Sequence, residues 1–171
     1  GNMPPEDAIL LDNWFPRARD VVLRNGYALH SDPLQAANVV GLVSHSAGAT
    51  SKLIAFSGGK AFDVSTAVPA QLALGLSPGA EVFGFNFKAR SFYLNGFDAV
   101  QSYDGTTFAS AGLGKDAAEA QAFDGTKLTT GMGYQNRLYL GGDGNLGFWY
   151  GTVNAVTGSM LFYFPLDGVM Q

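Results

Sequence analysis

The chain has 171 residues, enough for one domain with a single hydrophobic core. Hydrophobic residues make up 47% of the sequence, which excludes an intrinsically disordered chain, and its 23 glycines exclude a protein of long helices. The net charge of -4, with 10 dispersed Lys and Arg, argues against nucleic acid as the main ligand. Without cysteine, the chain has neither disulfides nor a Cys-based zinc site.

The first 30 residues differ in character from the rest. Pro5 and Pro16 favour extended backbone around Asn13–Arg17. Apolar residues flank Asn25-Gly26, a dipeptide typical of two-residue hairpin turns. We therefore expect an extended N-terminal segment and a first hairpin over residues 1–30, followed by a β-domain over residues 31–171. The residues at both ends suggest a piece cut from a longer polypeptide.

Beyond residue 37 the sequence repeats a basic residue, an apolar strand, a glycine-containing turn and a second strand. The copies begin at Lys52, Arg90 and Arg137, an interval of about 40–50 residues that is typical of propeller blades. The pattern predicts hairpin turns at Ser57–Lys60, Asn95–Asp98 and Gly141–Asn145. It leaves room for further strands at Val39–Val43, Val82–Phe87 and Leu128–Gly131.

The predicted fold class is all-β, a β-propeller-like body of about three blades of short antiparallel strands. Closed propellers need roughly four to eight blades, so this body is incomplete or part of a larger propeller. The alternative is a β-sandwich whose hairpins happen to be evenly spaced. One segment departs from the pattern: Lys115–Ala122 contains helix-forming residues without glycine and is expected to form a two-turn helix.

No residue pattern indicates an enzyme. The two histidines, His30 and His45, have no carboxylate at ligand spacing, so structural roles are expected for both. Ser44-His45-Ser46 lacks the G-x-S-x-G elbow of a serine hydrolase. Gly112–Ala117 imitates a dinucleotide-binding fingerprint, but no buried strand precedes it and a loop is expected. We therefore predict no catalytic residue, no cofactor and no metal.

Two acidic turns, Asp104-Gly105 and Asp124-Gly125, share the sequence aromatic-Asp-Gly-Thr. Paired carboxylates could serve a glycosidase, and clustered oxygens could hold calcium. Asp-Gly is more typical of turns, where the Asp side chain accepts local backbone hydrogen bonds and Gly takes a positive φ. A structural role is therefore predicted for both.

Most aromatic residues, including Phe148-Trp149-Tyr150 and Phe162-Tyr163-Phe164, are expected to pack in the core and between blades. The group around Trp14 lies before the first repeat. Because Trp and Arg are enriched in interface hot spots, we predict a protein-interaction site there; the alternative is that the group plugs the first blade. The site consists of Asn13, Trp14, Phe15 and Arg17.

Several segments, most specifically residues 2–17 and 134–150, resemble the N-terminal part of a family of tailed-phage and prophage virion proteins. These are tail or head–tail connector components, similar in plan to tail-nozzle and DNA-stabilisation proteins. The resemblance implies an extended N-terminal segment before a propeller-like body, with several copies arranged in a ring around the tail axis. The Ala-rich residues 115–122 depart from that plan.

The resemblance therefore implies a virion protein that is assembled in the host cytoplasm and retains and ejects DNA. Its partners would be copies of itself, other tail or connector proteins and, non-specifically, DNA in the channel. No small-molecule substrate is expected. No membrane contact is expected either, because glycines interrupt the charge-free residues 144–166. Two other functions stay open: a carbohydrate-binding or depolymerising propeller at the host surface, and a cellular propeller scaffold.

Overall fold

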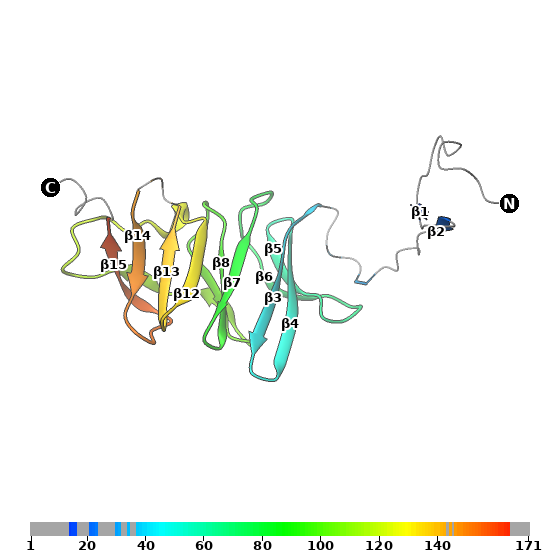
Figure 1. Cartoon of the computed structure of the whole chain (residues 1–171), viewed down its shortest axis with the longest axis horizontal. Coiled ribbons are helices and arrows are strands. Elements are labelled where there is room, and N and C mark those ends of the chain that lie inside the picture. Colours follow the sequence, from blue (N-terminus) through cyan, green and yellow to red (C-terminus); the bar gives the residue numbers. More distant parts are fainter. Residues whose placement is uncertain are drawn as a thin grey trace. The chain divides into compact units, whose positions relative to one another are not determined.

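The computed structural model describes residues 14–16, 21–23, 30, 31, 34, 37–142, 144 and 146–164 (Figure 1). The chain divides into two compact units, Gly1–His30 and Ser31–Gln171. Within the described residues the elements are strands, apart from one short 3-10 helix. The prediction of an all-β protein is confirmed.

The first unit contains a two-stranded antiparallel sheet. Strand β1 (Trp14–Pro16) pairs with β2 (Val21–Leu23), with Phe15 opposite Val22. Pro16 therefore ends a strand, a position where its missing N–H does little harm to a sheet. The predicted turn at Asn25-Gly26 lies outside the described residues.

The second unit begins with a four-stranded meander, which we call the first sheet. Its strands follow in chain order, and Ser57 pairs with Lys60 across the predicted turn. The strands are β3 (Val39–Ala47), β4 (Thr50–Ser57), β5 (Lys60–Asp63) and β6 (Ala70–Ala73). From Leu42 to Ala47, exposed residues of β3 alternate with less exposed ones, as expected for a strand with two different faces.

The second sheet repeats this plan. The turn predicted at Asn95–Asp98 joins its second and third strands, where Asn95 Oδ1 accepts hydrogen bonds from the backbone N–H groups of Phe97 and Asp98 at 3.0 and 2.8 Å. Its strands are β7 (Phe83–Phe87), β8 (Arg90–Leu94), β9 (Gln101–Tyr103) and β10 (Phe108–Ser110).

The third sheet has a meander of four strands and one added edge strand. The third predicted hairpin is confirmed, because β13 and β14 pair on either side of it. The meander consists of β12 (Thr130–Tyr134), β13 (Arg137–Gly141), β14 (Phe148–Gly151) and β15 (Gly158–Tyr163). Strand β11 (Leu113–Lys115), which precedes the meander in sequence, pairs in parallel with β15 at its outer edge.

The helix predicted over Lys115–Ala122 is wrong, and so is the loop predicted for Gly112–Ala117. Lys115 ends β11, and the residues after it are irregular up to a 3-10 turn at Gly125–Lys127. Hydrogen bonds to β15 hold this segment: Asp116 N–H donates to the Met160 carbonyl, and Glu119 Oε2 accepts from the Phe162 N–H. These contacts with a distant strand override the local helix propensity.

The three sheets follow one another in chain order, with β3 beside β7 and β7 beside β12 (Figure 1). We call the face of each sheet toward the following sheet its front, and the opposite face its back. The largest apolar cluster joins the front of the second sheet to the back of the third, and it includes Phe92, Leu138 and Trp149. A smaller one, with Ile54, Phe56 and Tyr93, joins the first and second sheets.

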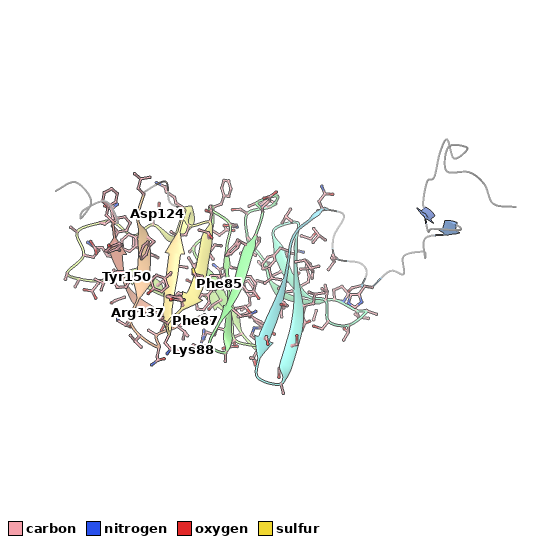
Figure 2. All side chains as sticks on the ribbon, in the orientation of Figure 1. Phe85, Phe87, Lys88, Asp124, Arg137 and Tyr150 are labelled. Atoms are coloured by element: carbon pink, nitrogen blue, oxygen red, sulfur yellow. The ribbon has the colours of Figure 1, made fainter. Side chains whose placement is uncertain are left out.

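Glycines bring the second and third sheets close together. A Cβ at Gly131 would lie 2.7 Å from a ring carbon of Phe85, and one at Gly133 only 2.3 Å from a ring carbon of Phe87. Figure 2 labels both phenylalanines, which come from β7. The first strand of the third sheet therefore fits against its neighbour because its back face carries no side chains there.

Candidate interaction surface

The front face of the third sheet is an exposed apolar surface of the second unit. Along β12, Thr130, Met132 and Tyr134 point to the front, while Gly131 and Gly133 point to the back. Met132 is 53% exposed and Tyr134 is 55% exposed. The back of the same sheet is buried, so the alternation separates a core face from an exposed apolar face.

Aromatic side chains form a continuous row across this front face. The ring of Tyr139 lies 6.5 Å from that of Tyr134, 5.7 Å from that of Phe148 and 6.4 Å from that of Tyr150, measured between centroids. The row continues from Phe148 to Tyr163 at 5.2 Å. Neighbouring rings at these separations on one sheet face are a rigid, preorganised surface.

One cation lies within this row. The Arg137 guanidinium lies 5.7 Å from the centroid of the Tyr150 ring, and its Nη1 donates a 3.0 Å hydrogen bond to the Gly151 carbonyl. Figure 2 labels Arg137 and Tyr150 on the third sheet. The cation–π contact and the hydrogen bond fix the Arg137 side chain, which leaves it oriented beside the aromatic rings.

A shallow groove of about 370 Å³ runs along β12 and β13 on this face. Its lining includes Thr130, Met132, Tyr134, Tyr139 and Phe148. The lining is almost wholly apolar, without the convergent polar groups that orient a small substrate. Such a groove suits apolar or aromatic side chains of a partner, or the flat face of a sugar ring, better than a charged metabolite.

A group of hydrogen-bonded polar side chains lies buried between the first and second sheets. His45 Nδ1 and Ser91 Oγ are 2.7 Å apart, and Ser91 Oγ donates to Asn86 Oδ1 at 2.6 Å. The single hydroxyl proton goes to Asn86, so His45 Nδ1–H is the donor to Ser91. Both His45 and Ser91 are fully buried, so no substrate reaches this histidine–serine pair.

In both acidic turns the Asp side chain accepts hydrogen bonds from nearby backbone N–H groups. The predicted turn structure is therefore confirmed for Asp104 and confirmed in part for Asp124. Asp104 Oδ1 accepts from the N–H groups of Thr106 and Thr107 at 2.9 and 2.7 Å, which lowers the pKa of Asp104, and Gly105 has a φ of 96°. Asp124 caps the 3-10 turn by accepting from Thr126 N–H at 3.1 Å. Gly125 does not take the predicted positive φ, because it begins that turn.

The residues predicted to form the interaction site fall in the first unit. Trp14 and Phe15 lie in β1, whereas Asn13 and Arg17 lie outside the described residues. Of the aromatic residues predicted to pack in the core and between blades, Phe148, Tyr150 and Tyr163 do not lie on the buried back face. They point to the front face, where Tyr163 is 50% exposed. Period-2 alternation along β14 places Phe148 and Tyr150 on the face opposite Trp149, but it does not indicate which of the two faces is buried.

No group of three or more His, Cys, Asp or Glu side chains that could hold a metal is found among the described residues. In the same part of the chain, no helix has the length and apolar character to cross a membrane. Comparisons of the chain with protein families, with curated proteins and with solved structures found no match.

Proposed function

We propose that the three sheets are blades of a β-propeller and that the chain is a structural component of a tailed-phage virion, in the tail nozzle or head–tail connector. Copies of the chain, together with other tail proteins, form a ring around the DNA channel. The ring retains the genome and releases it at ejection. The protein is assembled in the host cytoplasm and then resides in the virion.

The observation that carries this proposal is the exposed aromatic face of the third sheet. Large exposed apolar patches mark interaction surfaces, and aromatic residues and Arg are enriched at the centres of interfaces. Tyr134, Arg137 and Tyr139 lie within residues 134–150, one of the two segments with the most specific resemblance to virion proteins. The same residues thus support both the interaction surface and the class of protein.

The arrangement of the strands supports the propeller part of the proposal. Each sheet is a meander whose first strand, β3, β7 or β12, lies beside the first strand of the neighbouring sheet. In a propeller the first strands of successive blades surround the central axis in the same way.

The net charge of -4 suits a channel through which DNA slides without tight binding. Contact with DNA in this role is non-specific and weak. The proposal therefore assigns the chain no sequence-reading surface and no catalytic role.

Mass spectrometry of purified particles tests the assignment. Particles from cells that carry the gene are separated on a density gradient, and peptides of the chain are quantified against the other virion proteins. We expect the chain in a fixed ratio to them in intact particles. A chain that stays in the soluble fraction while particles form normally would contradict the proposal.

The aromatic row also favours a second candidate, a carbohydrate-binding propeller at the host surface. Tyr139 and Phe148 flank the groove, and exposed aromatic rings can stack on sugars. Saturation-transfer NMR with bacterial surface polysaccharides distinguishes the two candidates. Transfer from the front-face tyrosines to a polysaccharide, lost in Tyr139→Ala, would favour this function over the structural one.

A further inference from the structure

The three sheets can be aligned by their first hairpins. Each hairpin closes on a residue pair, Ala47 with Thr50, Phe87 with Arg90 and Tyr134 with Arg137. Counting back along the first strand from these pairs gives equivalent positions on both faces. The equivalent front-face positions are His45, Phe85 and Met132, and the equivalent back-face pairs are Ser44 and Ser46, Gly84 and Asn86, Gly131 and Gly133.

In three contacts between neighbouring first strands, a larger front side chain lies on a back glycine. At Gly41 the small residue is instead on the front of β3, against Val82 just before β7. Phe85 and Phe87 lie on Gly131 and Gly133, and Val43 lies on Gly84, where an added Cβ would be 2.7 Å from a methyl of Val43. This arrangement has a packing reason, because two strands with large residues on facing sides could not approach closely.

Two faces of the array are not covered by another of the three sheets described in the second unit. At one end is the front of β12, where Met132 and Tyr134 are both more than half exposed. At the other end is the back of β3, where Leu42 is 60% exposed and Ser44 and Ser46 are also exposed. One face presents large apolar side chains, and the other presents small ones beside an apolar patch.

We propose that a second copy of this chain covers the front of the third sheet, with its own β3 placed against β12. By equivalence with Phe85 and Phe87, Met132 would lie on Ser44 and Tyr134 on Ser46 of the other copy. The contact is heterologous, because it joins the front of β12 in one copy to the back of β3 in the other. Two copies arranged head to tail therefore form this contact twice, and their sheets make a closed ring. Counting the three sheets described in the second unit, two copies give six, within the range of about four to eight in closed propellers, whereas three copies would exceed it.

The back of the first sheet is suited to this contact. Ala55, Phe62 and Val64 on this face are buried, with Leu34 packed against them, so the outer part of the face is already covered. The β3 part stays exposed over Val39, Leu42, Ser44 and Ser46. The first strand of another sheet would cover this part of the back face, just as the front of β3 covers the back of β7.

This inference rests on the propeller architecture proposed above, and it makes the closed pair the building unit of the virion ring. It is tested on the 171-residue chain in solution by light scattering after size exclusion. We expect a mass of about 36 kDa, twice that of the 18.0 kDa chain. The presence of the chain in particles is a separate measurement, so a failure of either proposal is recognisable by itself.

Two single substitutions and their mixture test the pairing of faces. Met132→Glu places a charge on the front of β12, and Ser44→Lys places one on the back of β3; each alone should give a monomer of about 18 kDa. Mixing the two variants should restore the dimer, because one contact then pairs Glu with Lys and the other is unchanged. Val68→Glu, at a 77% exposed site between β5 and β6, is the control and should stay dimeric.

The alternatives give different results. A wild-type chain that stays monomeric well above micromolar concentration overturns the proposal and leaves the front face to another partner. A dimer that is broken by Met132→Glu but unaffected by Ser44→Lys also overturns it, because two front faces would then pair symmetrically. Recovery of the dimer in the mixture shows in addition that both variants are folded.

Discussion

His45 and Ser91 join the first and second sheets through a buried hydrogen bond of 2.7 Å between Nδ1 and Oγ. Further bonds extend the contact, because Asn86 accepts from Ser91 and donates through Nδ2 to the Ser44 carbonyl at 2.9 Å. On the other side of the ring, His45 Nε2 has no hydrogen-bond partner among the described residues. Both forms of the ring can donate Nδ1–H to Ser91, but the charged form would also bury an unpaired Nε2–H donor and a charge, which disfavours it.

This geometry predicts a loss of stability in mild acid. Burial lowers the pKa of His45 from its usual 6.5, the charge of Lys52 adds to that effect, and Asp104 opposes it. The unfolded chain then takes up a proton at higher pH than the folded one, so the free energy of unfolding falls as the pH drops below about 6.5. Urea unfolding between pH 5 and 8 measures this slope.

His45→Gln should flatten the slope, although it lowers stability at neutral pH by disturbing the bond to Ser91. The control is His30→Gln, which removes the chain's other histidine. An unchanged slope in His45→Gln would show that another group is responsible.

A substitution at Gly133 should reveal how closely the second and third sheets pack. In Gly133→Ala the new methyl would overlap the Phe87 ring, so we expect a loss of about 1–3 kcal/mol from overpacking. Gly114→Ala in β11 is the matched control, because no atom lies within 4 Å of its Cβ position and its φ is ordinary. Equal unfolding midpoints for the two variants would contradict the close approach.

Asp104→Asn should weaken a turn without affecting any activity. The amide accepts the N–H groups of Thr106 and Thr107 less strongly than the carboxylate does, and the side chain is partly exposed, so the loss should not exceed about 1 kcal/mol. Asp124→Asn should lose less, because its turn is more exposed. Thermal melts measure both. Loss of a polysaccharide-degrading activity in either variant would instead assign these residues to catalysis.

Trp14→Ala should block incorporation into virions and leave the sheets of the second unit intact. Trp14 lies in the β1–β2 sheet of the first unit, and the apolar clusters described between the larger sheets consist of residues of the second unit. Melting temperature and particle incorporation are measured on the same variant. Trp149→Ala is the contrast: its fully buried ring is core, and truncation should cost about 3–5 kcal/mol. A Trp14→Ala chain that is unfolded throughout would place Trp14 in the core.

The hairpins could be predicted because their signals are local. Ser57 to Lys60 carries its turn residues between two apolar strands, and no distant contact is needed to specify it. The same holds for the Asp104 turn. The faces of β14 could not be assigned locally, because Phe148, Trp149 and Tyr150 are all aromatic and only the position of the neighbouring sheet decides which is buried.

The strand at Leu113–Lys115 could not be predicted for a related reason. Its partner, β15, begins at Gly158, and the pairing is parallel and distant in sequence. Nothing near Lys115 indicates that pairing, whereas Lys115–Ala122 does carry residues that favour a helix. The candidate surface was missed in the same way, since Met132 and Tyr139 belong to one face only after β12 and β13 have paired.

The position of β11 also has a consequence for synthesis on the ribosome. The three residues Leu113–Lys115 emerge well before Gly158–Met160, the residues with which they pair. At about 5–20 residues per second, this interval lasts on the order of seconds. During that time the first two sheets can be complete while β11 and the apolar front of β7 wait for a partner. This interval is therefore when the nascent chain is most open to mispairing with another copy or to capture by a chaperone.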